Sequence, residues 1–410
     1  MTPRHILLGL SALLASGAAG RAADMPTPAA PAGPCKATLT FPAYGGLITQ
    51  NPNPGCITLP GVGDIYVGGA ITGYAFTQSN AFAPSTTTLP SDRSGLADFS
   101  NLQGFVQKPD GAFQAYLQAG LYTIPTLGTP TFATLEETRL LFGPVPVVYG
   151  KYVFNDEWSI QGGRMPTLIG VETIFTFQNL NIVRGLLFAQ ENAINQGVQV
   201  NYAKGPLSVS AAGTDGFFSG QIDWLTGLVS YKIDDSQTVS FDAGANLGRS
   251  SVNTFATPLL QNNSAIFNLN YSYAQGPWIL SPYLQFTNVE RDPRLGILQG
   301  ASTYGAAVVG SYAFTKMFAL AGRLEAEQQT GRRGSATTSL LFGPGSSAAS
   351  VTITPTFTFD RFVLRGEYSH TALFDIARGD AAAGVTGTGF GRFGSKTDQD
   401  RFVVEGGITF

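Results

Sequence analysis

Charged side chains in the C-terminal third of the chain alternate with apolar or small ones. From residue 318 to 327, every charge falls on an odd position, and two later segments repeat the pattern. Because consecutive side chains of a β-strand point to opposite faces, each segment would carry its charges on one face. Facing guanidinium and carboxylate groups would create a transverse field across water; alternatively, they pair and brace the wall, and both can hold together. These charged residues are Arg323, Glu325, Glu327, Arg365, Glu367, Arg401 and Glu405.

The sequence offers no recognisable catalytic set. Of the 2 histidines, His5 lies in the predicted leader described below and His370 lies near the end of an alternating segment. Histidine is the commonest general acid–base catalyst, but a histidine at a strand end is more often a loop residue than a proton carrier. No Ser–His–acid spacing, metal-ligand cluster or phosphate-binding loop occurs. We therefore expect no enzymatic activity, no metal and no cofactor.

The segments that position the charges repeat along most of the chain. From about Asp64 onward, segments of roughly ten alternating residues are joined alternately by tiny turns and by long polar links. The turns are rich in Gly, Pro, Asn and Asp, which favour tight reversal; they lie at 155–157, 204–206, 234–236, 275–277, 315–317 and 360–361. The long links lie at 78–94, 125–144, 167–193, 214–221, 248–263, 290–302, 329–348 and 371–399.

This alternation predicts an all-β fold, a transmembrane antiparallel β-barrel of about sixteen strands with short periplasmic turns and long external loops. An even number of strands places both termini on the periplasmic side. The pattern is least regular near 95–107 and 158–166. In the second of these segments, Arg164 has the opposite parity to Gln161 and Gly163. That strand therefore contains a bulge, or the assignment of its faces is wrong.

The composition also favours a membrane barrel. Charged residues make up 12% of the chain and hydrophobic residues 43%, against a charged share of roughly 25% in soluble proteins. Yet no stretch after the N-terminus has the roughly 18 consecutive apolar residues of a spanning helix. Aromatic residues gather beside the short turns, as at Trp158 and Trp278, which suits a membrane–water boundary better than a soluble β-sandwich. The net charge of −3 gives no reason to expect a nucleic-acid partner.

The N-terminal region predicts export. A signal peptide covering 1–22 is predicted by three features of its sequence. These are basic residues at 4–5, a short apolar stretch at 6–15 and small residues near position 22. Residues 23–60 are rich in Pro, Ala and Gly and would form a periplasmic lead-in, followed by the barrel at 61–410. Cys35 and Cys56 are the only 2 cysteines. In an oxidising compartment we expect them to form a disulfide, the alternative being two buried thiols.

The C-terminal segment has its own signature. One face carries Phe402, Val404, Gly406, Ile408 and the terminal Phe410. It resembles the C-terminal strand of outer-membrane proteins, which ends in Phe and is read by the barrel-assembly machinery. That machinery and outer-membrane lipid are therefore expected partners.

The middle of the chain resembles a known family. The residues that carry the resemblance are Gly163-Arg164-Met165-Pro166, Gly170, Glu172, Asn179, Asn181, Arg184-Gly185, Gly197-Val198 and Tyr202, with the later strands at 323–325 and 365–368. They look like the signature of the putative beta-barrel porin-2 (OmpL-like) family. The opening, Cys35 followed by Cys56-Ile57, is more similar to alphaproteobacterial porins. Both resemblances imply an outer-membrane channel.

The lumen and one loop are the candidate functional regions. A barrel of about sixteen strands is too wide for its own side chains to fill, and alternation adds Gln114, Gln118, Asn268 and Asn270 to the charged lining residues above. The link 167–193 is unusually apolar for an exposed loop. We predict that it folds into the barrel and narrows it, with Glu172, Arg184 and Glu191 near the constriction. The competing interpretation is a loop that caps the barrel or contacts other copies in a trimer.

The sequence therefore predicts a passive channel for small hydrophilic solutes or ions in a bacterial outer membrane. A homotrimer is a further hypothesis for its assembly. The main alternative is a structural or adhesive barrel with a closed lumen, which flux across liposomes would distinguish. A soluble exported β-sandwich is the third interpretation.

Overall fold

The strands form one continuous antiparallel sheet. The computed structural model describes residues 55–82, 92–333, 335, 338–380 and 382–410. Its strands are β1 (Gly55–Leu59), β2 (Gly63–Gln78), β3 (Gly95–Lys108), β4 (Phe113–Tyr122), β5 (Val147–Val153), β6 (Trp158–Pro166), β7 (Ile194–Lys204), β8 (Leu207–Thr214), β9 (Trp224–Lys232), β10 (Gln237–Asn246), β11 (Ser264–Gln275), β12 (Trp278–Val289), β13 (Ala301–Ala313), β14 (Phe318–Gln329), β15 (Ser347–Phe359), β16 (Phe362–Phe374) and β17 (Asp398–Thr409). Short helical pieces occur only between strands of this described part: α2 (Thr134–Leu140), η1 (Thr176–Gln178), η2 (Leu187–Gln190), α3 (Leu259–Asn262) and η3 (Pro293–Leu295).

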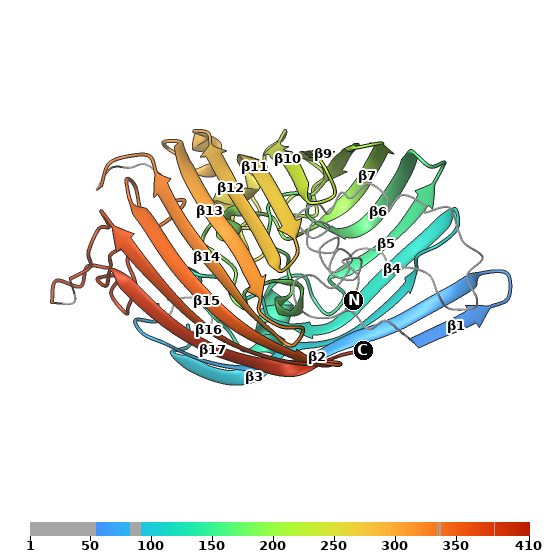
Figure 1. Ribbon diagram of the computed structural model, residues 1–410. Helices are drawn as coiled ribbons and strands as arrows, with labels where there is room; N and C mark the ends of the chain where they lie inside the picture. The colour runs from blue at the N-terminus through green and yellow to red at the C-terminus, as the bar shows by residue number, and fades with distance from the viewer. Residues whose placement is uncertain (1–54, 83–91, 334, 336–337, 381) are drawn as a thin grey trace.

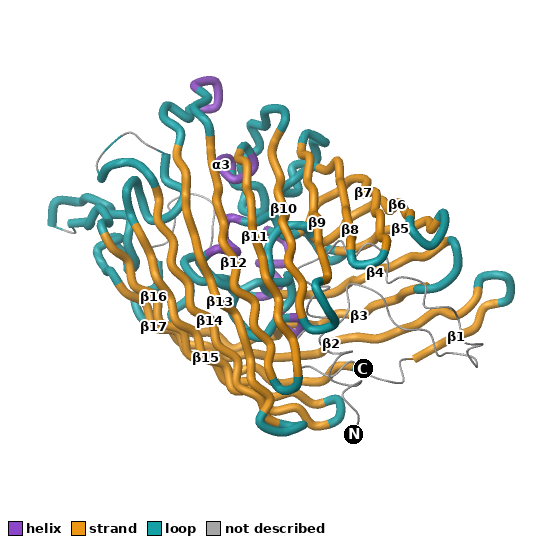
Figure 2. Tube along the Cα trace, turned by 45° about the horizontal axis from the view of Figure 1, so that its top comes forward, coloured by secondary structure: helices purple, strands orange, loops and turns teal. Residues whose placement is uncertain are grey.

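Each strand from β2 to β17 pairs with the next in the chain, and β17 pairs with β2, so that these strands close into a 16-stranded barrel. The predicted fold class and strand number are confirmed. Figure 1 shows the sheet curving round loop segments that lie inside it, and Figure 2 shows several short helical pieces there. Closure gives each strand from β2 to β17 a partner on both sides and leaves this barrel without an open edge toward lipid.

The connections alternate as predicted. Short turns follow β3, β5, β7, β9, β11, β13 and β15, and long loops follow the even-numbered strands. The strands near 95–107 and 158–166 are present as β3 and β6. β6 pairs with both neighbours without a register shift, so it has no bulge. Arg164 instead lies on the outer face, opposite Val148 in the strand register. Its guanidinium donates to the carbonyl oxygen of Val145 at 3.0 Å.

Apolar side chains cover the outside of the barrel and polar ones the inside. Strand alternation explains this, as in β14, where Leu320 and Leu324 are exposed while Arg323 and Glu325 are buried. The aromatic rings beside the short turns pack in pairs, such as Trp158 with Tyr202, whose ring centroids lie 4.7 Å apart. No helix in the described ranges is both long and apolar enough to span a membrane.

The predicted signal peptide and most of the lead-in lie outside the described residues. Cys35 is among them, so its disulfide with Cys56 stays a prediction. The last residues of the lead-in form β1, which pairs with the first residues of β2. Further along β2, the C-terminal residue completes the pairing of β17 with β2 that closes the barrel. Gly69 N donates to Phe410 O at 2.8 Å, and Phe410 N donates to Gly69 O at 3.0 Å.

The closing seam allows a test. An added Cβ at Gly69 would lie 2.5 Å from Phe410 Cζ and 2.8 Å from the Gln103 carbonyl oxygen. The Phe410 ring can rotate, but the carbonyl cannot move without disturbing the β2–β3 pairing. Gly69→Ala should therefore lower barrel stability by about 1–3 kcal/mol. The measurement is the urea concentration at which half of the protein no longer migrates as the folded barrel on an unheated gel. Gly104 faces Gly69 across the pairing and has nothing within 4 Å of an added Cβ, so Gly104→Ala is the control; equal midpoints would refute the account.

Candidate functional site: the lumen loop

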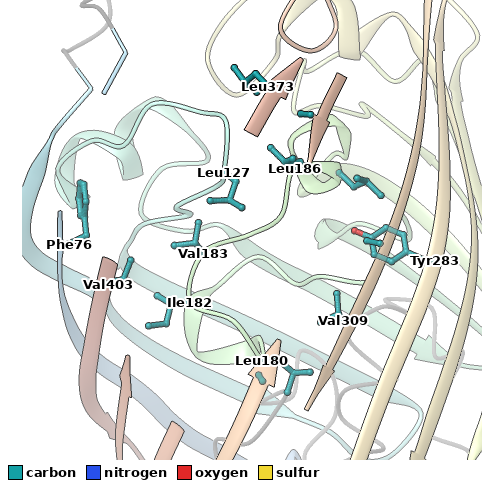
Figure 3. Packing of buried hydrophobic residues seen from close by; sticks show 14 of the residues in the cluster. Phe76, Leu127, Leu180, Ile182, Val183, Leu186, Tyr283, Val309, Leu373 and Val403 are labelled. Carbon is teal, nitrogen blue, oxygen red and sulfur yellow. The ribbon is translucent and has the colours of Figure 1, made fainter. Parts of the chain in front are cut away.

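The loop 167–193, named here the lumen loop, lies inside the barrel. Nearly all its residues are buried. Figure 3 shows its Ile182, Val183 and Leu186 between Val403 on one side and Tyr283 and Val309 on the other. Its apolar side chains thus pack against the wall and other loops, as the apolar composition predicts for a segment removed from water.

Carboxylates of the barrel wall hold the backbone of the lumen loop. Glu367 accepts from the amides of Ile182 at 2.5 Å and Val183 at 3.0 Å. Glu325 accepts from Leu186 N at 3.1 Å and Leu187 N at 3.4 Å. Hydrogen bonds to ionised acceptors are about twice as strong as neutral ones. These two wall residues, on β16 and β14, therefore act as anchors for the loop.

Wall arginines bind the same loop through its carbonyl groups. Arg323 donates to Val183 O at 2.8 Å and pairs with Glu172 at 2.7 Å and Glu325 at 3.0 Å. Arg365 donates to Thr176 O at 2.8 Å and Asn179 O at 2.9 Å, and it also pairs with Glu405. The alternating charges thus pair within the wall and bind the lumen loop, while a transverse field across water stays a prediction.

Arg184 lies within the loop and stabilises its internal shape. Its guanidinium donates to the carbonyl oxygens of Ile174 and Ile182 at 2.5 Å each and of Thr173 at 2.8 Å. The guanidinium has planar, divergent donors and can bridge several acceptors at once. The sequence predicts Arg184 near the constriction. In the structure its guanidinium donates to backbone carbonyl oxygens of the lumen loop itself.

The other predicted lining residues also face inward. Gln118 donates to Gln103, Asn268 and Asn270 donate to Asp242, and Arg401 donates to Gln78. Glu191 of the lumen loop accepts from Gln285 on β12 at 2.8 Å. Gln114 lies near a short turn and is only half-buried. Other inward residues nearer the short turns of β4–β10 are half-buried too, namely Lys151, Gln161, Ser208, Thr238 and Ser240.

Two acidic residues of this region were not predicted. Asp242 alternates with the outward Phe241 and Ala243 on β10, so the same period of two could have found it. Glu137 lies on α2 in the preceding loop, where no periodic signal exists. It accepts from Ile124 N at 2.8 Å and from the Thr123 hydroxyl, and burial raises its pKa to about 7.

The comparisons with known proteins agree with this architecture. The family model described as putative beta-barrel porin-2, OmpL-like, matches residues 64–410. No curated protein matches the chain in sequence.

Solved structures resemble the fold at low identity. A loop-deletion mutant of OmpT from Vibrio cholerae has a TM-score of 0.54 at 11% identity, covering 84% of this chain and 99% of that one. The channel DcaP of Acinetobacter baumannii has a TM-score of 0.53 at 11% identity, with 85% and 97% covered. An anion-selective porin from Comamonas acidovorans has a TM-score of 0.52 at 13% identity, with 84% and 99% covered. At such identity the likeness shows the fold alone.

Arg184→Ala should loosen the lumen loop without unfolding the barrel. Each buried carbonyl left without a donor costs about 1–3 kcal/mol, whereas the strand pairing of the barrel does not involve this side chain. Proteinase K added to the folded barrel should then cleave within 167–193, and mass spectrometry would locate the cuts. Arg291→Ala is the control, because Arg291 bonds to the carbonyl of Leu298 within an exposed loop. Equal resistance of the lumen loop in Arg184→Ala and wild type would contradict its structural role.

Proposed function

The chain belongs to the putative beta-barrel porin-2, OmpL-like family, and we propose that the lumen loop sets the size of the solutes that pass through its channel. The protein is a porin of the bacterial outer membrane. Passage is proposed to be passive diffusion of small hydrophilic solutes or ions through water. Polar, half-buried side chains near the periplasmic end of β4–β10 support a hydrated entrance on that side.

The observation that carries the proposal is the attachment of the lumen loop to the wall through Glu325 and Glu367. The side chains of a 16-stranded wall do not reach across the interior. An inserted segment must therefore determine how much of the cross-section stays open. Because its amides are bound by buried carboxylates, this segment is held in place and does not drift within the lumen.

These contacts also favour insertion over the competing interpretation. A loop that caps the barrel or contacts other copies would present its apolar side chains outward. Here Asn181 donates to Thr354 on β15 at 2.7 Å, and Thr303 on β13 donates to Gln190 at 2.6 Å. The burial of the lumen loop against the wall would also suit a structural or adhesive barrel with a closed lumen. Ion flux across liposomes distinguishes that alternative.

The finer parts of the proposal rest on the sequence. They are cleavage of the signal peptide near residue 22, recognition of the strand ending in Phe410 by the assembly machinery, homotrimer formation and the lack of enzymatic activity. The pore-lining role of the inward residues belongs here as well. Their burial against the lumen loop supports a narrow zone at this level of the barrel.

Deleting residues 174–188 should raise single-channel conductance in a planar bilayer. The deletion removes the segment that occupies the lumen and leaves the β6 and β7 strands intact. We expect an increase of severalfold, together with faster uptake of larger uncharged sugars by liposomes. Deleting 293–296, in an exposed external loop, should leave conductance unchanged. An unchanged conductance after the first deletion would refute the constriction, and the absence of any current from wild type would refute the channel.

A further inference from the structure

One side of the lumen carries more acidic than basic groups. Register places Asp242, Asn268, Gln285, Gly305 and Glu327 side by side on the five consecutive strands β10–β14. Glu191 of the lumen loop joins this row through its bond to Gln285. We name Asp242, Glu191 and Glu327 the acidic wall. All three are buried.

The acidic wall has neutral partners only. Asp242 accepts from Asn268 at 2.8 Å, from Asn270 at 2.5 Å and from the amide of Gly170 at 3.2 Å. Glu191 and Glu327 accept from the amides of Gln285 and Gln190. Among the described residues, none of the three forms an ion pair. The neighbouring Arg323 is already shared between Glu172 and Glu325.

Oxygen atoms without partners lie along the same wall. Within the described part of the chain, these include one carboxylate oxygen each of Glu191 and Glu327, the amide oxygens of Asn268 and Asn270, and the hydroxyls of Tyr283 and Thr287. Figure 3 shows the Tyr283 hydroxyl turned toward the interior. The amide oxygens, and the carboxylate oxygens in their ionised form, can only accept hydrogen bonds or bind a cation. An anion would find few donors here.

Buried carboxylates without a cationic partner are unfavourable unless they are protonated or are reached by water or a cation. We propose that the acidic wall binds and passes small cations, so that the channel, if it conducts as proposed above, selects cations over anions. Acidic side chains lining a pore concentrate cations there and repel anions. The hard oxygen atoms of carboxylate and amide groups suit alkali and alkaline-earth ions.

The arginines of the remaining wall do not cancel this charge. Arg365 pairs with Glu405 and is further bound by loop carbonyls. Arg401 donates to Gln78 at 2.9 Å and to the carbonyl oxygen of Thr126 at 3.4 Å. Arg323 and Arg365 are thus paired with carboxylates, whereas Arg184 and Arg401 bond to neutral groups. Among the described residues, none of these four arginines forms an ion pair with the acidic wall.

The acidic wall would hold ions only weakly. Among the described residues, no group of three or more His, Cys, Asp or Glu side chains is arranged to hold a metal ion. Conduction requires binding strong enough to admit an ion and weak enough to release it. A dispersed row of carboxylates and amides meets that condition better than a chelate does.

The test is the reversal potential of the purified full-length porin in a planar bilayer under a KCl gradient. Wild type should prefer K⁺ over Cl⁻ by at least about threefold. Asp242→Asn and Glu327→Gln should each lower this ratio. In the double variant it should come close to the ratio of the K⁺ and Cl⁻ mobilities in bulk solution. The control is Glu290→Gln, which removes one negative charge from an exposed external position and should leave the ratio unchanged.

The outcomes separate this inference from the proposed function. Absence of current from wild type refutes the channel itself. Current with no preference, or with a preference for Cl⁻, leaves the channel standing and overturns cation selectivity. If wild type prefers K⁺ but the variants, shown to be folded by their migration on unheated gels, keep the same ratio, the acidic wall is not its source. If the double variant fails to fold, the two single variants still decide whether the acidic wall is the source.

Discussion

The structure depends on how a wide barrel satisfies the polar groups of the segment inside it. A loop removed from bulk water must find partners for its amides and carbonyls. Here Glu325 and Glu367 accept from loop amides, while Arg323 and Arg365 donate to loop carbonyls. The dependence is mutual, since these buried wall charges would themselves lack part of their hydrogen bonding without the loop.

The closure of the barrel and the width of its aperture depend on different interactions. The backbone ladder from β2 to β17 closes through β17–β2 pairing and does not involve the lumen loop. The aperture instead follows from side-chain contacts between wall and loop. Changes on the lumen face can therefore alter permeation while the barrel keeps its strands and its place in the membrane. Such a division suits a porin, in which one scaffold can carry different selectivities.

The period-two pattern predicted much of the fold because each strand must face lipid on one side and the lumen on the other. It predicted the strand number, the alternation of links and the inward direction of residues such as Arg323 and Glu367. It could not reveal which partners these residues take, because Glu367 and Ile182 are far apart in the chain and meet only after closure. Apolar composition predicted insertion of the lumen loop. The internal role of Arg184 and the burial of Glu137 depend on loop geometry, which has no periodic signal.

Insertion of the lumen loop is the central claim, and a cross-link tests it most directly. Asn181 in the loop and Thr354 on β15 are in side-chain contact at 2.7 Å. With both replaced by cysteine, and Cys35 and Cys56 replaced by serine, mild oxidation of the folded porin in detergent should form a 181–354 disulfide that changes its migration on a gel. Failure to form this bond in a folded barrel, with both thiols remaining free to react, would show that the loop lies elsewhere.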